Sequence, residues 1–218
     1  MRHLQIRHTS PLEREFEAWI VAGIEEYFES LGIVYSVFAV SPDLEPIWPA
    51  DERILTNGKV FGLQFKQAKL SGSSQPLPAQ LKWSLHSPAP QFNQVLATPE
   101  VYYCLPTFIN RDYRKQALEH CVFWRPNPQQ LDKNAWYNNP GAHTPYKQLE
   151  SEARWGLFVE QVFNCNIGRR ISSASKLAEY VHEIRAHRAH RAIPDSPTNG
   201  DQPSEQEAVY VVAVSLET

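Results

Sequence analysis

Long apolar runs are missing from this 218-residue chain, and so is a strong charge of either sign. Because no run of about eighteen apolar residues occurs, no membrane-spanning segment is expected. Residues 1–8 (MRHLQIRH) contain no apolar signal core before a small-residue cleavage site, so secretion is not expected either. The formal net charge is only -3, so nucleic acid would have to be bound through local basic patches. These absences favour a cytoplasmic protein with no membrane partner.

Cysteine is also scarce. Cys104, Cys121 and Cys165 are far apart and show no Cys-x-x-Cys spacing, so neither a disulfide framework nor a zinc site is predicted. Cys104 and Cys121 lie in apolar runs and are expected to be small core residues. The chain also lacks a glycine-rich phosphate loop and a Gly-x-Ser-x-Gly elbow, which argues against P-loop nucleotide hydrolysis and an α/β-hydrolase.

The residues that are present suffice for a globular core, since 42% are apolar and 11% aromatic. Residues 1–192 are predicted to form one domain. Residues 193–208 are polar and contain prolines, which predicts a flexible linker. Residues 209–218 begin with an apolar run that predicts either an edge strand or a tail that docks on another chain by strand addition, in a homodimer or with a partner protein.

The first helix is predicted over residues 11–31. Ser10 is expected as its N-cap and Glu13 as the capping-box residue, and Gly32 ends it. Residues 33–40 then predict the first strand. Glu17 falls at the side of the apolar helix face, where a carboxylate needs a cation, a hydrogen bond or a metal. A structural ion pair with an arginine would explain Glu17 equally well.

The pair Asn57-Gly58 separates residues 51–56 from residues 59–69, which predicts a tight hairpin between two strands. In the second of these strands, Gln64 and Lys66 share the face opposite the apolar residues. The hairpin would bring Asp51 beside them. Two oxygen donors and an ammonium then make a plausible magnesium site, although a solvated strand face has the same pattern.

Other short apolar runs and helical periodicities predict the remaining elements. The expected strands cover residues 101–106 and 121–124, and the expected helices cover residues 91–97, 112–119 and 172–191. Residues 154–163 fit either a strand or a helix. Residues 71–90 are predicted to form a long loop that Trp83 anchors, and residues 132–146 to be irregular. Trp124 and Trp155 are expected in the core.

With an acidic residue in the expected second strand and Gln64-Phe65-Lys66 in the third, residues 10–106 resemble the PD-(D/E)XK superfamily of restriction-endonuclease-like nucleases. The resemblance implies an α/β (α+β) fold in which helices flank a mixed central sheet with the order α-β-β-β-α-β. It also implies Mg²⁺ or Mn²⁺ held by Asp51, Gln64 and Glu17, with Glu13 as the alternative helix acid. Lys66 would be the catalytic lysine.

Gln64 departs from the usual motif because it offers a carbonyl oxygen without a charge, which should lower metal affinity. The resemblance therefore implies either a metal-dependent nuclease, with DNA as the expected substrate and defence against foreign DNA as its role, or a degenerate nuclease fold that serves as a nucleic-acid-binding or assembly subunit. Basic side chains expected to contact backbone phosphates are Lys69, Lys82, Arg185, Arg188 and Arg191. The basic end of the last helix also fits simple complementation of the helix dipole.

Overall fold

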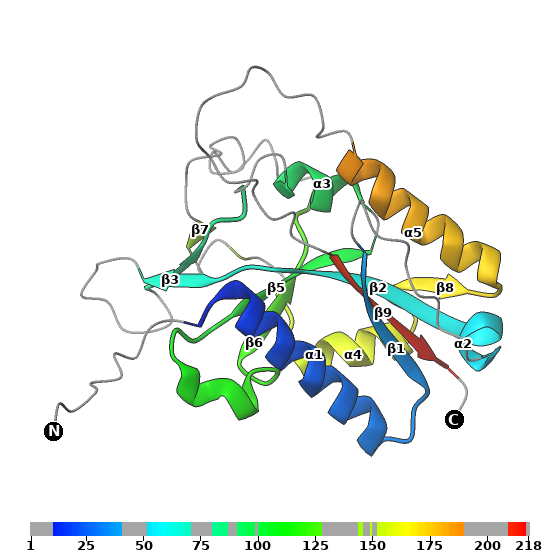
Figure 1. The fold of residues 1–218 in the computed structure, drawn as a ribbon, viewed down its shortest axis with the longest axis horizontal. Coiled ribbons are helices and arrows are strands. Elements are labelled where there is room, and N and C mark those ends of the chain that lie inside the picture. The colour runs from blue at the N-terminus through cyan, green and yellow to red at the C-terminus, as the bar shows by residue number, and fades with distance from the viewer. Residues whose placement is uncertain are drawn as a thin grey trace, which may run out of the picture.

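The structure is a computed structural model that describes residues 11–40, 52–70, 80–86, 91–98, 100–127, 144–145, 149, 152–189 and 209–216. Its main feature is a mixed sheet flanked by helices (Figure 1), with the strand order β1-β9-β2-β5-β6 and with β8 paired to the beginning of β2. These strands are β1 (Tyr35–Val40), β2 (Gly58–Phe65), β5 (Val101–Pro106), β6 (Cys121–Trp124), β8 (Arg169–Ile171) and β9 (Val209–Ser215). A smaller sheet contains β3 (Ala68–Leu70), β4 (Leu81–Trp83) and β7 (Thr144–Pro145).

Helices cover both faces of the main sheet. Figure 1 shows α1 (Glu13–Ser30) and α4 (Trp155–Phe163) on one side, with α3 (Gln91–Ala97) and α5 (Ala174–Ala189) on the other. A short helix, α2 (Glu52–Asn57), leads directly into β2, and a 3-10 helix, η1 (Arg111–Gln116), lies between β5 and β6. None of the helices in the described ranges is long and apolar enough to cross a membrane.

Several elements agree with the sequence predictions. The first helix is α1, and Gly32 ends it with a φ of 66° that only glycine adopts easily. The bounds of α3, β5 and β6 match the predicted ranges. Residues 154–163, which fitted two kinds of element, contain the helix α4. The helix predicted over residues 112–119 is a 3-10 helix that begins at Arg111.

The predicted capping of α1 differs in the structure. Leu12 is the N-cap residue, and its backbone N–H donates to Glu15 Oε2 at 2.8 Å. Glu15 therefore makes the contact that the sequence assigned to Glu13, and it also pairs with Arg111 of η1 at 2.6 Å. Ser10 lies outside the described residues. The carboxylate of Glu13 is left for other contacts.

The predicted hairpin at Asn57-Gly58 is wrong, because the six residues before Gly58 form the helix α2. The chain turns from α2 into β2 so tightly that a Cβ on Gly58 would overlap the carbonyl oxygen of Ile54. The carbonyl of Asn57 accepts a hydrogen bond from the backbone N–H of Leu216 at 2.9 Å. Gly58 therefore permits the tight turn from the end of α2 into β2, and it is not part of a two-residue hairpin loop.

The strand β9 lies in the middle of the sheet rather than at its edge. It pairs antiparallel with β1, where Val212 faces Val37, and antiparallel with β2, where Val212 faces Phe61. The segment forms a strand, as one of the two predictions had it, but the expected place at an edge and the docking tail are wrong, because both backbone edges of β9 are already paired. Its apolar residues suit this place since one set is buried on each face of the sheet: Val209, Val211 and Ala213 on one, Val212 and Val214 on the other.

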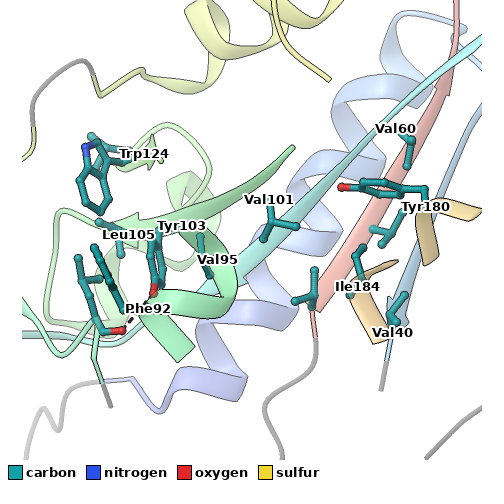
Figure 2. Packing of buried hydrophobic residues seen from close by; sticks show 14 of the residues in the cluster. Val40, Val60, Phe92, Val95, Val101, Tyr103, Leu105, Trp124, Tyr180 and Ile184 are labelled. Atoms are coloured by element: carbon teal, nitrogen blue, oxygen red, sulfur yellow. Dashed lines mark hydrogen bonds between the residues drawn. The ribbon is translucent and has the colours of Figure 1, made fainter. Parts of the chain in front are cut away.

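The two faces of the sheet carry separate cores. Figure 2 shows the core under α3 and α5, where Tyr180 lies between Val60 and Ile184. In the same core, Tyr103 donates a hydrogen bond to the carbonyl of Leu85 at 3.0 Å. On the other face, Phe16, Ile20, Ile24 and Phe28 of α1 pack with Phe61, Leu63 and Phe65 of β2.

The expected anchoring and core residues are buried. Trp83 is fully buried and donates its Nε1–H to the carbonyl of Pro106 at 3.2 Å, and it belongs to the strand β4 within the range that was predicted to be a loop. Trp124 and Trp155 are core residues, and so are Cys104 and Cys121. Burial is the first cause that raises the pKa of the Cys104 thiol well above its usual range, as expected for a cysteine that packs rather than reacts.

Candidate functional site

Lys66 stands directly after β2, the strand that joins the two sheets. All eight residues of β2 are buried, and the chain leaves the main sheet after Phe65 to begin β3 at Ala68. The side chain of Lys66 is only 3% exposed. Because Lys66 lies beyond the end of β2, the alternation of side chains along that strand does not determine which face of the sheet its side chain takes. An ammonium buried to this degree needs compensating groups.

Glu13 supplies one of these groups from the first turn of α1. Its Oε1 lies 3.8 Å from Nζ of Lys66, and its Oε2 accepts the backbone N–H of Gln67 at 3.0 Å. The side-chain amide of Gln67 in turn donates to the carbonyl of Pro11 at 2.7 Å. These contacts tie the beginning of α1 to the segment that leaves β2, so the carboxylate and the ammonium are held near each other.

Glu17 is the second carboxylate on this side of the sheet. It is four residues after Glu13 on α1, so the two side chains project from the same face of the helix. Glu17 is 9% exposed and accepts a hydrogen bond from the hydroxyl of Tyr210 in β9. Burial, followed by the charge of Glu17 and this hydrogen bond, raises the pKa of Tyr210. The ring of Tyr210 packs edge-on against Phe65, with 5.3 Å between centroids.

Tyr210 is a site residue that sequence reasoning missed. It faces Leu63 across the β9–β2 pairing, so a residue from the end of the chain lies beside the end of β2. Its own segment shows only an apolar strand pattern, which gives no indication of the partner strand. Tyr210 is thus one hydrogen-bond partner of Glu17, supplied by β9.

Gln64 lies on the other face of β2. It lines a small cavity of about 10 Å³ together with Gln91 and Thr98 from the α3 region and Ile184 from α5. Its side-chain amide donates weakly to the carbonyl of Phe65 at 3.5 Å. Gln64 and Glu17 therefore project from opposite faces of the sheet. Asp51, the predicted third metal ligand, lies outside the described residues.

The predicted phosphate-binding residues fall into two groups. Lys69 of β3 stands directly opposite Lys82 of β4, and the ammonium of Lys69 donates to Ser84 Oγ at 3.4 Å. Like charges opposite each other across two strands destabilise the pair, and a bound anion would offset this. Arg185 is half-buried on α5, on the far face of the main sheet. The side chain of Arg188 and the whole of Arg191 lie outside the described residues.

The carboxylate oxygens next to Lys66 are of the type that binds a hard cation such as Mg²⁺. Magnesium prefers carboxylate oxygens, and Glu13 and Glu17 offer them from one helix face. Within the described ranges, no three His, Cys, Asp or Glu side chains are grouped closely enough to hold a metal ion. A complete ligand set would therefore need a further donor, and the sequence suggests Asp51 for this role.

A scan against protein-family models, a search of curated proteins and a search of solved structures each found no match to this chain. The fold and the cluster of Lys66, Glu13, Glu17 and Tyr210 define a mixed α/β protein with a buried lysine and two carboxylates at the end of a central strand.

Proposed function

We propose that the cluster around Lys66 is the active site of a metal-dependent nuclease that hydrolyses phosphodiester bonds of nucleic acid, with DNA as the expected substrate. One observation carries the proposal: Lys66 is almost completely buried at the end of β2, 3.8 Å from Glu13 on the helix that also carries Glu17. A buried ammonium beside carboxylates can stabilise negative charge that develops on a reacting phosphate.

The burial of Glu17 supports the same proposal. A purely structural ion pair would need one carboxylate beside Lys66, and Glu13 already supplies it. Glu17 adds a second carboxylate four residues further along α1, with its side chain almost completely buried. Carboxylate oxygens are the ligands that magnesium prefers, so two acids on one helix face beside a lysine suit a bound divalent cation.

The residues of the chain have distinct parts in the proposed reaction. A magnesium ion held by Glu17, Glu13 and Asp51 would supply Lewis-acid polarisation of the phosphate and a more acidic water. The ammonium of Lys66 orients the attacking water and offsets the negative charge that develops on the phosphate. Tyr210 holds the carboxylate of Glu17 in place through its hydroxyl. Hydrolysis by in-line attack then breaks the phosphodiester bond with inversion at phosphorus.

Contacts with the substrate backbone are assigned to the small sheet. Lys69 and Lys82 face each other on β3 and β4, and β3 begins two residues after Lys66. Phosphates bound there would remain close to the cluster. Such contacts are independent of sequence and weaken as salt concentration rises.

The test is cleavage of supercoiled plasmid, single-stranded DNA and RNA in magnesium, in manganese and in EDTA. We expect metal-dependent cutting by the unaltered protein and a loss of about 100-fold or more in Lys66→Met and Glu17→Gln, because each change removes a charged group from the reacting centre. Asp51→Ala should show the same loss. Lys176→Ala is the matched control, since Lys176 is an exposed lysine on α5 that pairs with Glu179.

Cutting that persists in folded Lys66→Met would contradict the proposal. Circular dichroism and thermal unfolding verify that each variant is folded. If no protein cuts in any metal while all bind DNA equally, the chain is instead a nucleic-acid-binding or assembly subunit built on a nuclease-like arrangement.

A further inference from the structure

A pocket of about 730 Å³ opens between the end of α1, the helix α4 and the end of α2. Small-molecule sites commonly have volumes of roughly 300–1,000 Å³ and mainly apolar walls. The walls of this pocket are apolar over much of their area, with side chains from three separate parts of the chain. They include Tyr27, Leu31, Ile33, Val159, Phe163 and Leu216.

This pocket is separate from the cluster around Lys66. Asn57, which precedes β2, lines the pocket, whereas Lys66 follows the last residue of β2. An eight-residue strand spans roughly 25 Å, so the two places lie at opposite ends of the same strand. Nothing in the following inference depends on nuclease activity.

One wall of the pocket is formed by a glycine inside a helix. Gly156 is in the first turn of α4, is exposed and lines the pocket. A Cβ at this position would meet no atom within 4 Å, so the space beside it is open. A larger side chain at position 156 would therefore occupy the pocket without displacing the protein's own atoms.

The rim of the pocket carries a cation, Arg170 of β8, which is exposed. Its guanidinium makes no hydrogen bond or ion pair with the residues that the structure describes. Arg170 stands directly opposite Lys59 of β2. Lys59 is buried, and its ammonium donates to the carbonyls of Ile167 and Gly168, both at 2.9 Å.

The local charge favours an anionic ligand. Lys59 and Arg170 are two cations opposite each other across two strands, an arrangement that destabilises the pair unless an anion compensates it. Glu160 of α4 also lines the pocket, but it forms no ion pair with Arg170. The guanidinium of Arg170, at the rim of the pocket, is therefore the group that would receive an anionic ligand.

We propose that the pocket binds an amphipathic organic anion, whose apolar body packs between α1 and α4 and whose carboxylate pairs with the guanidinium of Arg170. Planar guanidinium groups bind carboxylates through two parallel hydrogen bonds, which fixes the orientation of the ligand. The apolar walls accept the hydrocarbon part, and burial of its surface supplies the main driving force for binding.

Cys165 provides a reporter for this binding. It is exposed and lines the pocket, whereas Cys104 and Cys121 are buried, so a thiol reagent modifies Cys165 selectively in the folded protein. The probes are decanoate, decanol and decylammonium, which share an apolar chain and differ in charge. We expect decanoate to slow modification of Cys165 at concentrations about tenfold lower than decanol, and decylammonium to be the weakest. Arg170→Ala should remove the difference between decanoate and decanol.

Calorimetric titration with decanoate gives a second readout. Gly156→Trp should abolish binding because the indole fills the pocket, while Leu157→Trp should leave binding unchanged because Leu157 is exposed and does not line the pocket. Equal binding of all three probes, or full binding by folded Gly156→Trp, would overturn the proposal. Protection of Cys165 that depends only on protein concentration would also overturn it, because the pocket would then be covered by a second copy of the chain.

Discussion

At the scale of single residues, Glu100 has a left-handed backbone conformation and accepts hydrogen bonds from several elements of the fold. Its φ is 59°, which costs a non-glycine residue about 1–3 kcal/mol. Its carbonyl accepts hydrogen bonds from the N–H of Gly62 at 2.8 Å and from the hydroxyl of Tyr180 at 3.2 Å. Its carboxylate accepts from Tyr102 at 3.1 Å and from the N–H of Gly168 at 2.9 Å.

We expect Glu100→Ala to lower the free energy of unfolding by about 2 kcal/mol, because the hydroxyl of Tyr102 and the N–H of Gly168 lose their acceptor. Urea denaturation measures the change. Glu100→Gly removes the same carboxylate but relieves the backbone, so it should cost less than the alanine variant. Equal stability of Glu100→Ala and the unaltered protein would contradict the role of the carboxylate.

Some residues of the candidate site could be recognised in the sequence, and others could not. Lys66 and Glu17 were indicated by position alone, since each is a charge next to an apolar pattern, and both are buried in the structure. The direction of Gln64 and the part of Tyr210 depend on how strands and helices pack on both sides of β2, which no local pattern contains.

At the scale of elements, the junction of α2 and β2 depends on Gly58. A Cβ there would meet the backbone carbonyl of Ile54, which no side-chain rotation can relieve. We expect Gly58→Ala to destabilise the protein by about 1–3 kcal/mol. Gly156→Ala is the matched control, because a Cβ in that helix meets open space and should stabilise the protein by up to about 1 kcal/mol. Thermal unfolding of both variants tests the contrast, and a Gly58→Ala protein as stable as the control would refute it.

The element β9 has the largest expected effect on the fold. Removal of residues 209–218 deletes the strand between β1 and β2 and exposes apolar residues on both faces of the sheet. We expect the shortened chain to lose its cooperative thermal transition, as measured by circular dichroism. A synthetic peptide of residues 209–216 should restore the transition when it is added in excess. Cooperative unfolding of the shortened chain at an unchanged midpoint would contradict the central place of β9.

At the scale of the whole molecule, buried tyrosines make stability depend on alkaline pH. Burial is the main cause that raises the pKa of Tyr102 and Tyr180, and the charge of Glu100 raises both further. The pKa of a tyrosine in the unfolded chain is about 10, so the hydroxyl protons of Tyr102 and Tyr180 are bound more tightly in the folded state than in the unfolded state. The stabilisation is complete below about pH 10 and is lost as pH rises above that value.

We therefore expect the urea midpoint to be constant between about pH 8 and pH 9.5 and to fall at higher pH, together with a rise in tyrosinate absorbance. Tyr180→Phe should weaken this dependence. It should cost only about 1 kcal/mol at neutral pH, since the carbonyl of Glu100 keeps its hydrogen bond from Gly62. An unchanged alkaline profile in Tyr180→Phe would show that Tyr180 does not contribute.

The sequence by itself determined the elements whose signals are local. The apolar face of α1, the glycine that ends it, and the short apolar runs of β5 and β6 depend on neighbouring residues, and the structure confirms them. Only the tertiary structure decided that residues 52–57 form a helix and that β9 lies between β1 and β2. A strand's partner is chosen by long-range burial on both of its faces. For this reason the end of the chain supplies Tyr210 to a site that the sequence had placed in a local hairpin.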